Sequence, residues 1–195
     1  MNYSQAFLSA VTKLMSYEIG GWFNPDADGF EQGFTDTLAH RHACGYTIDP
    51  NDAGGETKYG IAKKENPDID VTNLTWEDAK IIYWNRYWVS EHCDQLPGRV
   101  GALLFDCSVN PGPGVAPKFL QRALGVTADG VIGPQTLASA NQQDPIALCT
   151  SMTNQRTAYY EAVVDAHPED QEYLAGWLRR VNEMQAFVTD PNGNF

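Results

Sequence analysis

Residues 5–22 read QAFLSAVTKLMSYEIGGW, which predicts an amphipathic helix over residues 5–18 with Ser4 as its N-cap. Apolar positions recur every three or four residues from Phe7 onward, so they share one face of this helix. Glu18 continues the same apolar stripe, and the Gly-Gly pair that follows it ends the helix. The stretch therefore predicts a helix that ends on a carboxyl group directed toward the core side.

The remaining sequence predicts further helices and almost no sheet, so the expected fold class is mainly α. Thr75 caps a helix whose first turn carries acidic residues. Later segments show helical periodicity with glycine or proline at their ends. The expected helices cover about residues 75–87, 100–107, 116–124, 135–140, 145–163 and 171–188. Residues 22–56 look irregular, and a short β-hairpin is expected within residues 45–61.

The composition is that of a globular protein with a strongly acidic surface. The chain has 195 residues, 43% of them hydrophobic, and a net charge of −12. Such a charge repels nucleic acid and anionic lipid, so neither nucleic acid nor a membrane is expected as a partner. The N-terminus lacks the basic start and apolar run of a signal peptide, so synthesis in the cytoplasm without a standard export signal is expected.

No metal site or cofactor is expected, although two patterns resemble parts of metal sites. Residues 24–29 resemble the first half of a calcium loop, but Thr35 stands where the bidentate Glu belongs. His40, His42 and Cys44 alternate without a fourth ligand nearby; a metal there would favour a zinc peptidase. The four cysteines form no C-x-x-C pair, which argues against a zinc knuckle, and free, mostly buried thiols are expected rather than disulfides. They are Cys44, Cys93, Cys107 and Cys149.

Glu18 is the most informative residue of the sequence. A carboxyl group on an apolar stripe loses hydration, which disfavours its ionised form. A carboxyl that keeps its proton near neutral pH can act as a general acid. The alternative is a helix-terminal Glu that pairs with an arginine or is simply solvated.

Residues 49–61, DPNDAGGETKYGI, together with EIGGW at residues 18–22, resemble the catalytic region of glycoside hydrolase family 108. This family comprises lysozyme-like muramidases that are common among phage endolysins. The resemblance continues, in order, through most of the chain. It includes YW at 87–88, LP at 96–97, FDCSVNPG at 105–112, LQRALG at 120–125, DGVIGPQT at 129–136 and GWLRRV at 176–181.

The resemblance implies a lysozyme-like helical fold with a short hairpin and irregular segment at the active site. It implies hydrolysis of the β-1,4 bond between N-acetylmuramic acid and N-acetylglucosamine, with Glu18 as the catalytic acid. Residues 1–95 would form the catalytic region, and residues 96–195 a helical peptidoglycan-binding region packed against it. The expected partner is therefore the glycan strand of peptidoglycan.

The sequence departs from the family pattern at two places. Ile19 replaces the usual first glycine after the acid, which is a mild change. Residues 23–46, approximately, are an insertion between the acid and the Asp-Pro segment. The insertion is expected to be a surface loop or small subdomain beside the cleft. Three roles stay open for it: restricting the substrate, contacting an inhibitor or immunity protein, or binding an ion.

A glycoside hydrolase usually needs a second group on the other face of the sugar. Asp52 is the candidate, with Thr57 holding the water, and this assignment gives inversion at the anomeric carbon. Turn chemistry is the alternative for Asp52, because an Asp before Ala-Gly-Gly can cap its own backbone. A further alternative is an enzyme that works with little more than Glu18.

Aromatic residues are candidates for sugar stacking or for the core. Tyr59 and Trp22 are assigned to substrate binding, and Trp88 is assigned to the core. Asn110 is a third substrate-binding candidate. It lies one helical turn after Asp106, and both could face the floor of the cleft, although hydrogen bonding in the core is the favoured alternative for the pair. Trp177 and Arg180 are expected to be structural, locking the last helix.

The sequence thus predicts an N-acetylmuramidase that leads to bacterial lysis, acting in the periplasm or cell wall after release or delivery. It could serve as a phage endolysin or as a secreted effector. Two alternatives stay open. A lytic transglycosylase cuts the same bond with a lone Glu and leaves an anhydro end. A non-catalytic peptidoglycan-binding module would have its cleft blocked by the insertion.

Overall fold

The computed structural model describes residues 2–19, 23, 44–48 and 55–195. The predicted mainly α class is confirmed, because the described strands are the two-residue pair β1 (Thr57–Lys58) and β2 (Ile61–Ala62) and most other described residues are helical. The chain divides into two compact units, Val11–Trp84 and Met1–Ala10 with Asn85–Phe195. We call these the hairpin unit and the helical unit. The proposed regions 1–95 and 96–195 divide the chain elsewhere and stay a prediction about function.

Helix α1 (Gln5–Glu18) has the predicted bounds and begins in the helical unit. Ser4 Oγ accepts the backbone N–H of Phe7 at 3.4 Å, as expected of its cap. Phe7 lies in an aromatic cluster of the helical unit, with ring centroids 5.4 Å from Trp88 and 5.7 Å from Phe105. Trp88 is fully buried, so its assignment to the core is confirmed.

The hairpin unit contains the rest of α1, the β1–β2 hairpin and α3 (Trp76–Tyr83). The capping box predicted for α3 is present: Thr75 Oγ1 accepts from Asp78 N at 3.1 Å, and Asp78 accepts from Thr75 N at 3.1 Å. The helix continues as a π-helical segment, η1 (Trp84–Val89), where the sequence predicted an uninterrupted α-helix. The hairpin begins inside the predicted segment, residues 45–61, and ends one residue after it, at Ala62.

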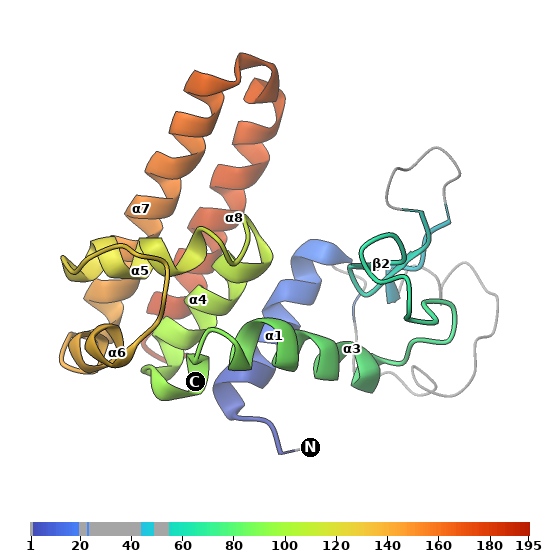
Figure 1. Cartoon of the computed structure of the whole chain (residues 1–195), viewed down its shortest axis with the longest axis horizontal. Helices are drawn as coiled ribbons and strands as arrows, with labels where there is room; N and C mark the ends of the chain where they lie inside the picture. The colour runs from blue at the N-terminus through green and yellow to red at the C-terminus, as the bar shows by residue number, and fades with distance from the viewer. Residues whose placement is uncertain (1, 20–22, 24–43, 49–54) are drawn as a thin grey trace. The chain divides into compact units, whose positions relative to one another are not determined.

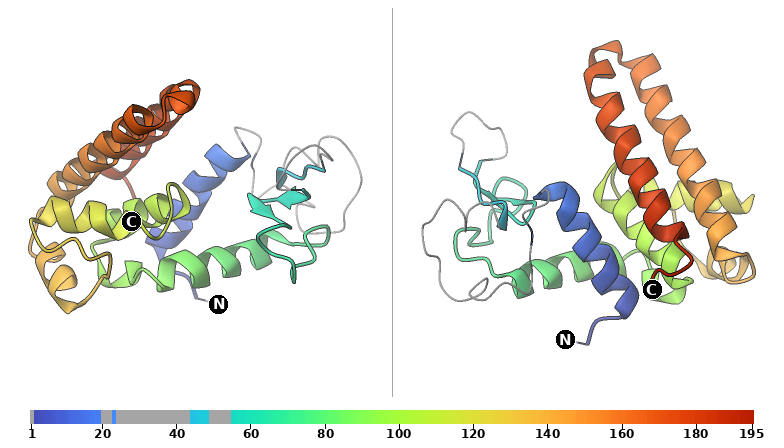
Figure 2. Two further views of the ribbon diagram at one scale, coloured as in Figure 1. Left: turned by 45° about the horizontal axis from the view of Figure 1, so that its top comes forward. Right: turned by 180° about the vertical axis from the view of Figure 1, so that it is seen from behind.

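The helical unit is built around the buried helix α4 (Gly98–Val109), which contacts α5 (Ala116–Leu124), α7 (Pro145–Ala166) and α8 (Gln171–Thr189). Helices α7 and α8 lie side by side along their length, joined by the turn η3 (Pro168–Asp170) (Figures 1 and 2). Short elements η2 (Cys93–Gln95) and α6 (Pro134–Ala140) complete the unit. The helix bounds agree with those predicted from caps and periodicity. Among the described residues, no helix combines the length and apolarity needed to cross a bilayer.

Candidate active site

Glu18 is the last residue of α1 and is exposed, which corrects the expectation that its side chain points into the core. The apolar stripe that precedes it is buried through Leu14 and Met15, but the helix ends where that packing ends. Glu18 therefore projects beyond the core.

The turn of the β-hairpin lies against the Glu18 carboxyl. A β-carbon built on Gly60 would stand 3.2 Å from Glu18 Oε2 and 2.8 Å from the Tyr83 hydroxyl oxygen. Only a residue without a side chain permits this approach, and the backbone φ of +72° at Gly60 also favours glycine. The Tyr83 hydroxyl donates to the Tyr59 carbonyl at 2.8 Å, which fixes the turn to α3. Glu18, the turn and Tyr83 thus converge from three elements of the hairpin unit.

Thr57, the candidate water-positioning residue, begins the first strand of this hairpin. It pairs with Ala62 across the turn, and its backbone exchanges hydrogen bonds of 2.9 and 3.0 Å with Thr47. The two-residue turn, Tyr59–Gly60, has positive φ at both positions, as a type I′ turn requires. The structure therefore brings Glu18 to the hairpin that carries Thr57. Asp52 and Trp22 lie outside the described residues.

Tyr59 is 1% exposed, so its ring offers no free face to a sugar. It packs against Trp76 with ring centroids 5.6 Å apart, and the centroid of the Phe23 ring lies 4.9 Å from that of the same indole. The assignment of Tyr59 to the cleft is corrected on this ground. Its unusual φ of 53° places the backbone in the turn and the ring in the core.

Glu56 is a carboxylate of the motif that the sequence analysis passed over. Tyr46 Oη donates to Glu56 Oε1 at 2.9 Å, and Thr72 Oγ1 donates to the same oxygen at 2.5 Å. Two hydroxyl donors hold this carboxylate between the hairpin and the loop that follows it. Its geometry is that of a structural link rather than of a free catalytic base.

Asp106 is the centre of a buried charge cluster in the helical unit. Its carboxylate accepts from Arg156 Nη1 at 2.6 Å and from Arg180 Nη2 at 2.8 Å, and it is 2% exposed. Burial alone would raise the pKa of Asp106, but the two guanidinium groups outweigh it and hold the pKa below its ordinary value. The readings of Asp106 as a core residue and of Arg180 as a lock on the last helix agree with these contacts. Arg156, fully buried, was missed by the sequence analysis.

Asn110 follows this cluster at the end of α4 and is half-buried. Its side-chain oxygen accepts from the Tyr160 hydroxyl at 2.6 Å, and its carbonyl accepts from Arg156 Nη2. It lines a pocket of about 280 Å³ between the end of α4 and the α7–α8 pair. Asn110 is in the helical unit, so it stays a substrate-binding candidate in a different unit from Glu18.

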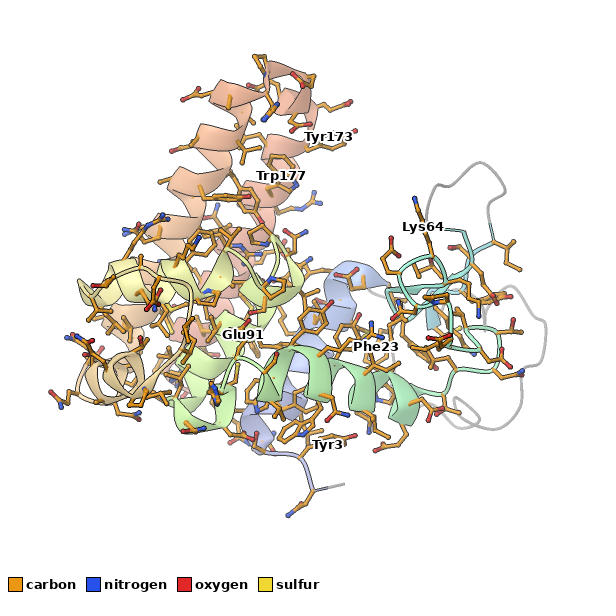
Figure 3. All side chains as sticks on the ribbon, viewed as in Figure 1. Tyr3, Phe23, Lys64, Glu91, Tyr173 and Trp177 are labelled. Atoms are coloured by element: carbon orange, nitrogen blue, oxygen red, sulfur yellow. The ribbon has the colours of Figure 1, made fainter. Side chains whose placement is uncertain are left out.

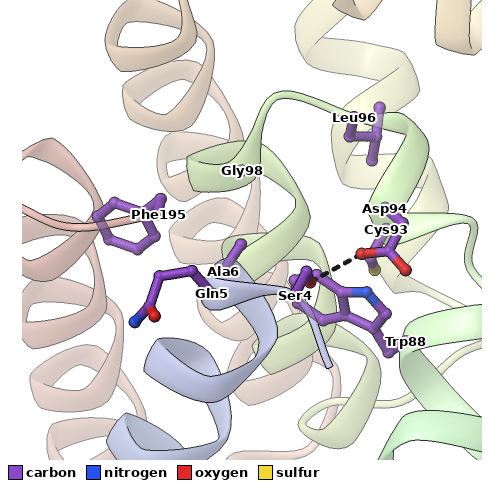
Figure 4. Close-up of a pocket in the computed structure, with 9 residues that line it drawn as sticks. All are labelled: Ser4, Gln5, Ala6, Trp88, Cys93, Asp94, Leu96, Gly98 and Phe195. Atoms are coloured by element: carbon purple, nitrogen blue, oxygen red, sulfur yellow. Dashed lines mark hydrogen bonds between the residues drawn. The ribbon is translucent and has the colours of Figure 1, made fainter. Parts of the chain in front are cut away.

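A second pocket, of about 250 Å³, lies elsewhere in the helical unit (Figure 4). Its walls include the indole of Trp88, the ring of Phe195 and the backbone at Gly98. The Ser4 hydroxyl donates to Asp94 at 2.8 Å at its edge. Asp94 is the acidic residue among those that line this pocket, and its carboxylate accepts this hydrogen bond.

Glu91 is a buried carboxyl group outside the candidate site, at 8% exposure (Figure 3). Among the described residues no ion pair or hydrogen bond involves its carboxyl, and burial raises its pKa to about 7. An acid whose pKa rises on folding stabilises the fold at low pH, and this contribution is lost as the pH climbs from 4.5 through 7.

Glu91→Gln is therefore expected to raise the free energy of unfolding at pH 8 by about 1–2 kcal/mol and to change it little at pH 4. Denaturant titrations of both proteins at the two pH values measure the difference. Equal stability gains at both pH values would attribute the effect to packing rather than to ionisation.

All four cysteines are free and buried, which confirms the expectation of thiols rather than disulfides. Burial raises the pKa of Cys107 to about 11 and that of Cys149 to about 12. In the described part of the chain, no three His, Cys, Asp or Glu side chains are placed to hold a metal ion. The calcium-like pattern at 24–29 and the pair His40 and His42 lie outside the described residues.

Comparison with known proteins identifies two matched regions. Residues 37–112 match the family described as Glycosyl hydrolase 108, and residues 115–182 match the family described as Predicted Peptidoglycan domain. Among solved structures, SagA of Brucella abortus is 28% identical, with a TM-score of 0.61 over 73% of this chain and 84% of its own. No curated protein matches the chain. The first match includes Thr57 and Asn110 and begins after Glu18.

Proposed function

We propose that this chain belongs to glycosyl hydrolase family 108, carries a C-terminal peptidoglycan domain and is an N-acetylmuramidase. The two family matches support a glycoside hydrolase that acts on peptidoglycan. The proposal adds the bond, which is the β-1,4 linkage from N-acetylmuramic acid to N-acetylglucosamine, and the residues that cleave it. One observation carries it: the exposed Glu18 carboxyl lies against the glycine turn of the hairpin that bears Thr57.

In the proposed mechanism Glu18 donates its proton to the glycosidic oxygen as the bond breaks. A bound glycan strand would cover this exposed carboxyl and bring it within reach of the glycosidic oxygen. Asp52 activates a water on the opposite face of the sugar, and Thr57 orients that water by hydrogen bonding. Attack from the opposite face inverts the anomeric carbon.

The products distinguish this proposal from its alternatives. Digestion of purified peptidoglycan is expected to release muropeptides with reducing N-acetylmuramic acid ends, each heavier by one water than its anhydro counterpart. Mass spectrometry of the soluble fraction measures this difference. Predominantly anhydro ends would make the chain a lytic transglycosylase, and no solubilised muropeptide would make it a binding module.

A cellular site of action follows from the proposed substrate. Peptidoglycan lies in the cell wall, so we propose that the chain acts there after release or delivery and that its activity leads to lysis. Contact of an inhibitor or immunity protein with residues 23–46 belongs to the same proposal. Most of that segment lies outside the described residues.

A further inference from the structure

The pocket beside Asn110 has aromatic walls contributed by two helices of the helical unit. Tyr159, Tyr160 and Val163 come from α7, and Trp177 comes from α8. Tyr160 and Trp177 stack with ring centroids 5.0 Å apart and an interplanar angle of 22°. This stack fixes the indole orientation, and Trp177, which is half-buried, keeps part of its surface at the pocket. Figure 3 shows Trp177 on the α7–α8 pair.

The pocket also contains residues with a hydrogen-bond donor and with a hydrogen-bond acceptor. The Tyr160 hydroxyl occupies the side-chain oxygen of Asn110, so the Asn110 amide nitrogen remains as a donor. This nitrogen donates no hydrogen bond to another residue in the described part of the chain. The Asp170 carboxylate, at the end of η3, lines the same pocket and forms no ion pair among those residues. Asn110 and Asp170 thus add a residue with a donor and a residue with an acceptor to a pocket with aromatic walls.

We propose that this pocket is a second glycan-binding site, which holds one N-acetylated sugar ring of a peptidoglycan strand away from the cleavage site. The proposal rests on the proposed function, because it takes peptidoglycan as the substrate. A sugar ring presents apolar C–H faces to aromatic rings and hydroxyl and amide groups to an amide donor and a carboxylate. A volume of about 280 Å³ lies near the lower limit of about 300 Å³ for ligand pockets and suits a single ring.

Charge favours the glycan over the stem peptide as the occupant. The stem peptide carries carboxylates, which need a cationic or strongly donating partner. No basic side chain is among the described residues lining the pocket, and Asp170 adds a negative charge. The chain as a whole carries a net charge of −12, which opposes anionic groups further.

The pocket also lies where the two matched regions meet. Asn110 is within the glycosyl hydrolase match, which ends at residue 112, while the aromatic residues are within the peptidoglycan-domain match, which begins at residue 115. A sugar bound there would hold the strand through residues of both regions. The site would raise the affinity for insoluble substrate without contributing to bond cleavage.

The test fills the pocket by Val163→Trp, because Val163 is half-buried in α7 and outside the ring stack. Val131→Trp is the matched control, because Val131 is an exposed valine of the same unit that does not line the pocket. Each is made in the Glu18→Gln background, so that the sedimented peptidoglycan stays intact during the measurement. Val163→Trp is expected to weaken binding by about tenfold, and Val131→Trp to leave it within about twofold.

A second measurement identifies the ligand. N-acetylglucosamine added to the isotope-labelled chain is expected to shift the Trp177 indole N–H signal in NMR spectra, and Val163→Trp is expected to abolish this shift. Asp170→Asn, which keeps the size of the side chain, should reduce it. Free stem peptide should leave the signal in place.

The outcomes separate this inference from the proposed function. Val163→Trp that binds peptidoglycan like its parent, or a Trp177 shift caused by stem peptide alone, would overturn the sugar site. Hydrolysis by the wild-type chain would be intact in either case. Conversely, a chain that binds N-acetylglucosamine at Trp177 but releases no muropeptides would support the second glycan-binding site and overturn the proposed muramidase activity.

Discussion

Replacing Glu18 with Gln is expected to lower kcat for peptidoglycan hydrolysis by about 10²- to 10⁴-fold, the contribution of a positioned general acid. Gln has nearly the same shape but no titrating proton to donate. Glu18 is exposed at the end of α1, so the substitution should leave the fold intact. Release of soluble muropeptides from purified peptidoglycan measures the rate, and an unchanged thermal midpoint shows that the loss is chemical.

Glu65→Gln is the matched control, since Glu65 is an exposed carboxylate of the same hairpin unit. It removes one negative charge, as Glu18→Gln does, and is expected to keep wild-type activity. A Glu18→Gln protein that solubilises peptidoglycan at the wild-type rate would refute the assignment of the acid. Equal losses in the two variants would point to overall charge rather than to a proton donor.

The helix bounds could be predicted because their signals are local. Ser4 and Thr75 accept backbone N–H groups of the turns that follow them, as N-caps do. Gly125 ends α5 in the left-handed conformation, with φ of 70°. In each case the groups that form the cap lie within four residues of one another, so their spacing in the sequence is enough to predict where the helix begins or ends.

The environment of the candidate site could not be predicted in the same way. Periodicity placed Glu18 on the apolar face of α1, but it carries no information on where the opposing surface ends. Tyr59 looked like a sugar-stacking ring, yet the type I′ turn directs its ring against Trp76. Both differences arise from contacts between elements, which a stripe or a motif does not encode.

The charge cluster of the helical unit shows the same limit. Arg156 is separated from Asp106 by 50 positions in the chain. An arginine within a helix usually means a solvated side chain, because charged residues are seldom fully buried without a partner. Only the packing of α7 against α4 reveals that Arg156 is fully buried and paired.

Asp106→Asn is expected to destabilise the chain by about 3–5 kcal/mol, because it leaves buried guanidinium charge without a counter-ion. Arg156 has no exposure to water that could replace the lost carboxylate, and Arg180 loses its ion pair with Asp106 as well. Denaturant unfolding measures the loss. Glu77→Gln breaks the surface pair with Lys80 at 2.6 Å and is the control, expected to cost less than about 1 kcal/mol.

The pH dependence of the two proteins tests whether charge is the cause. The folded-state pKa of Asp106 is depressed, so its ionised form stabilises the fold above its ordinary pKa of 3.8, and this contribution is lost as the pH falls below that value. The difference in the free energy of unfolding between wild type and Asp106→Asn should therefore become smaller at acid pH. If this difference in the free energy of unfolding stays constant from pH 7 to pH 3, the loss of stability comes from packing and not from charge. Because Arg156 also holds the carbonyl of Asn110, the variant should bind N-acetylglucosamine at the Trp177 pocket more weakly even where it remains folded.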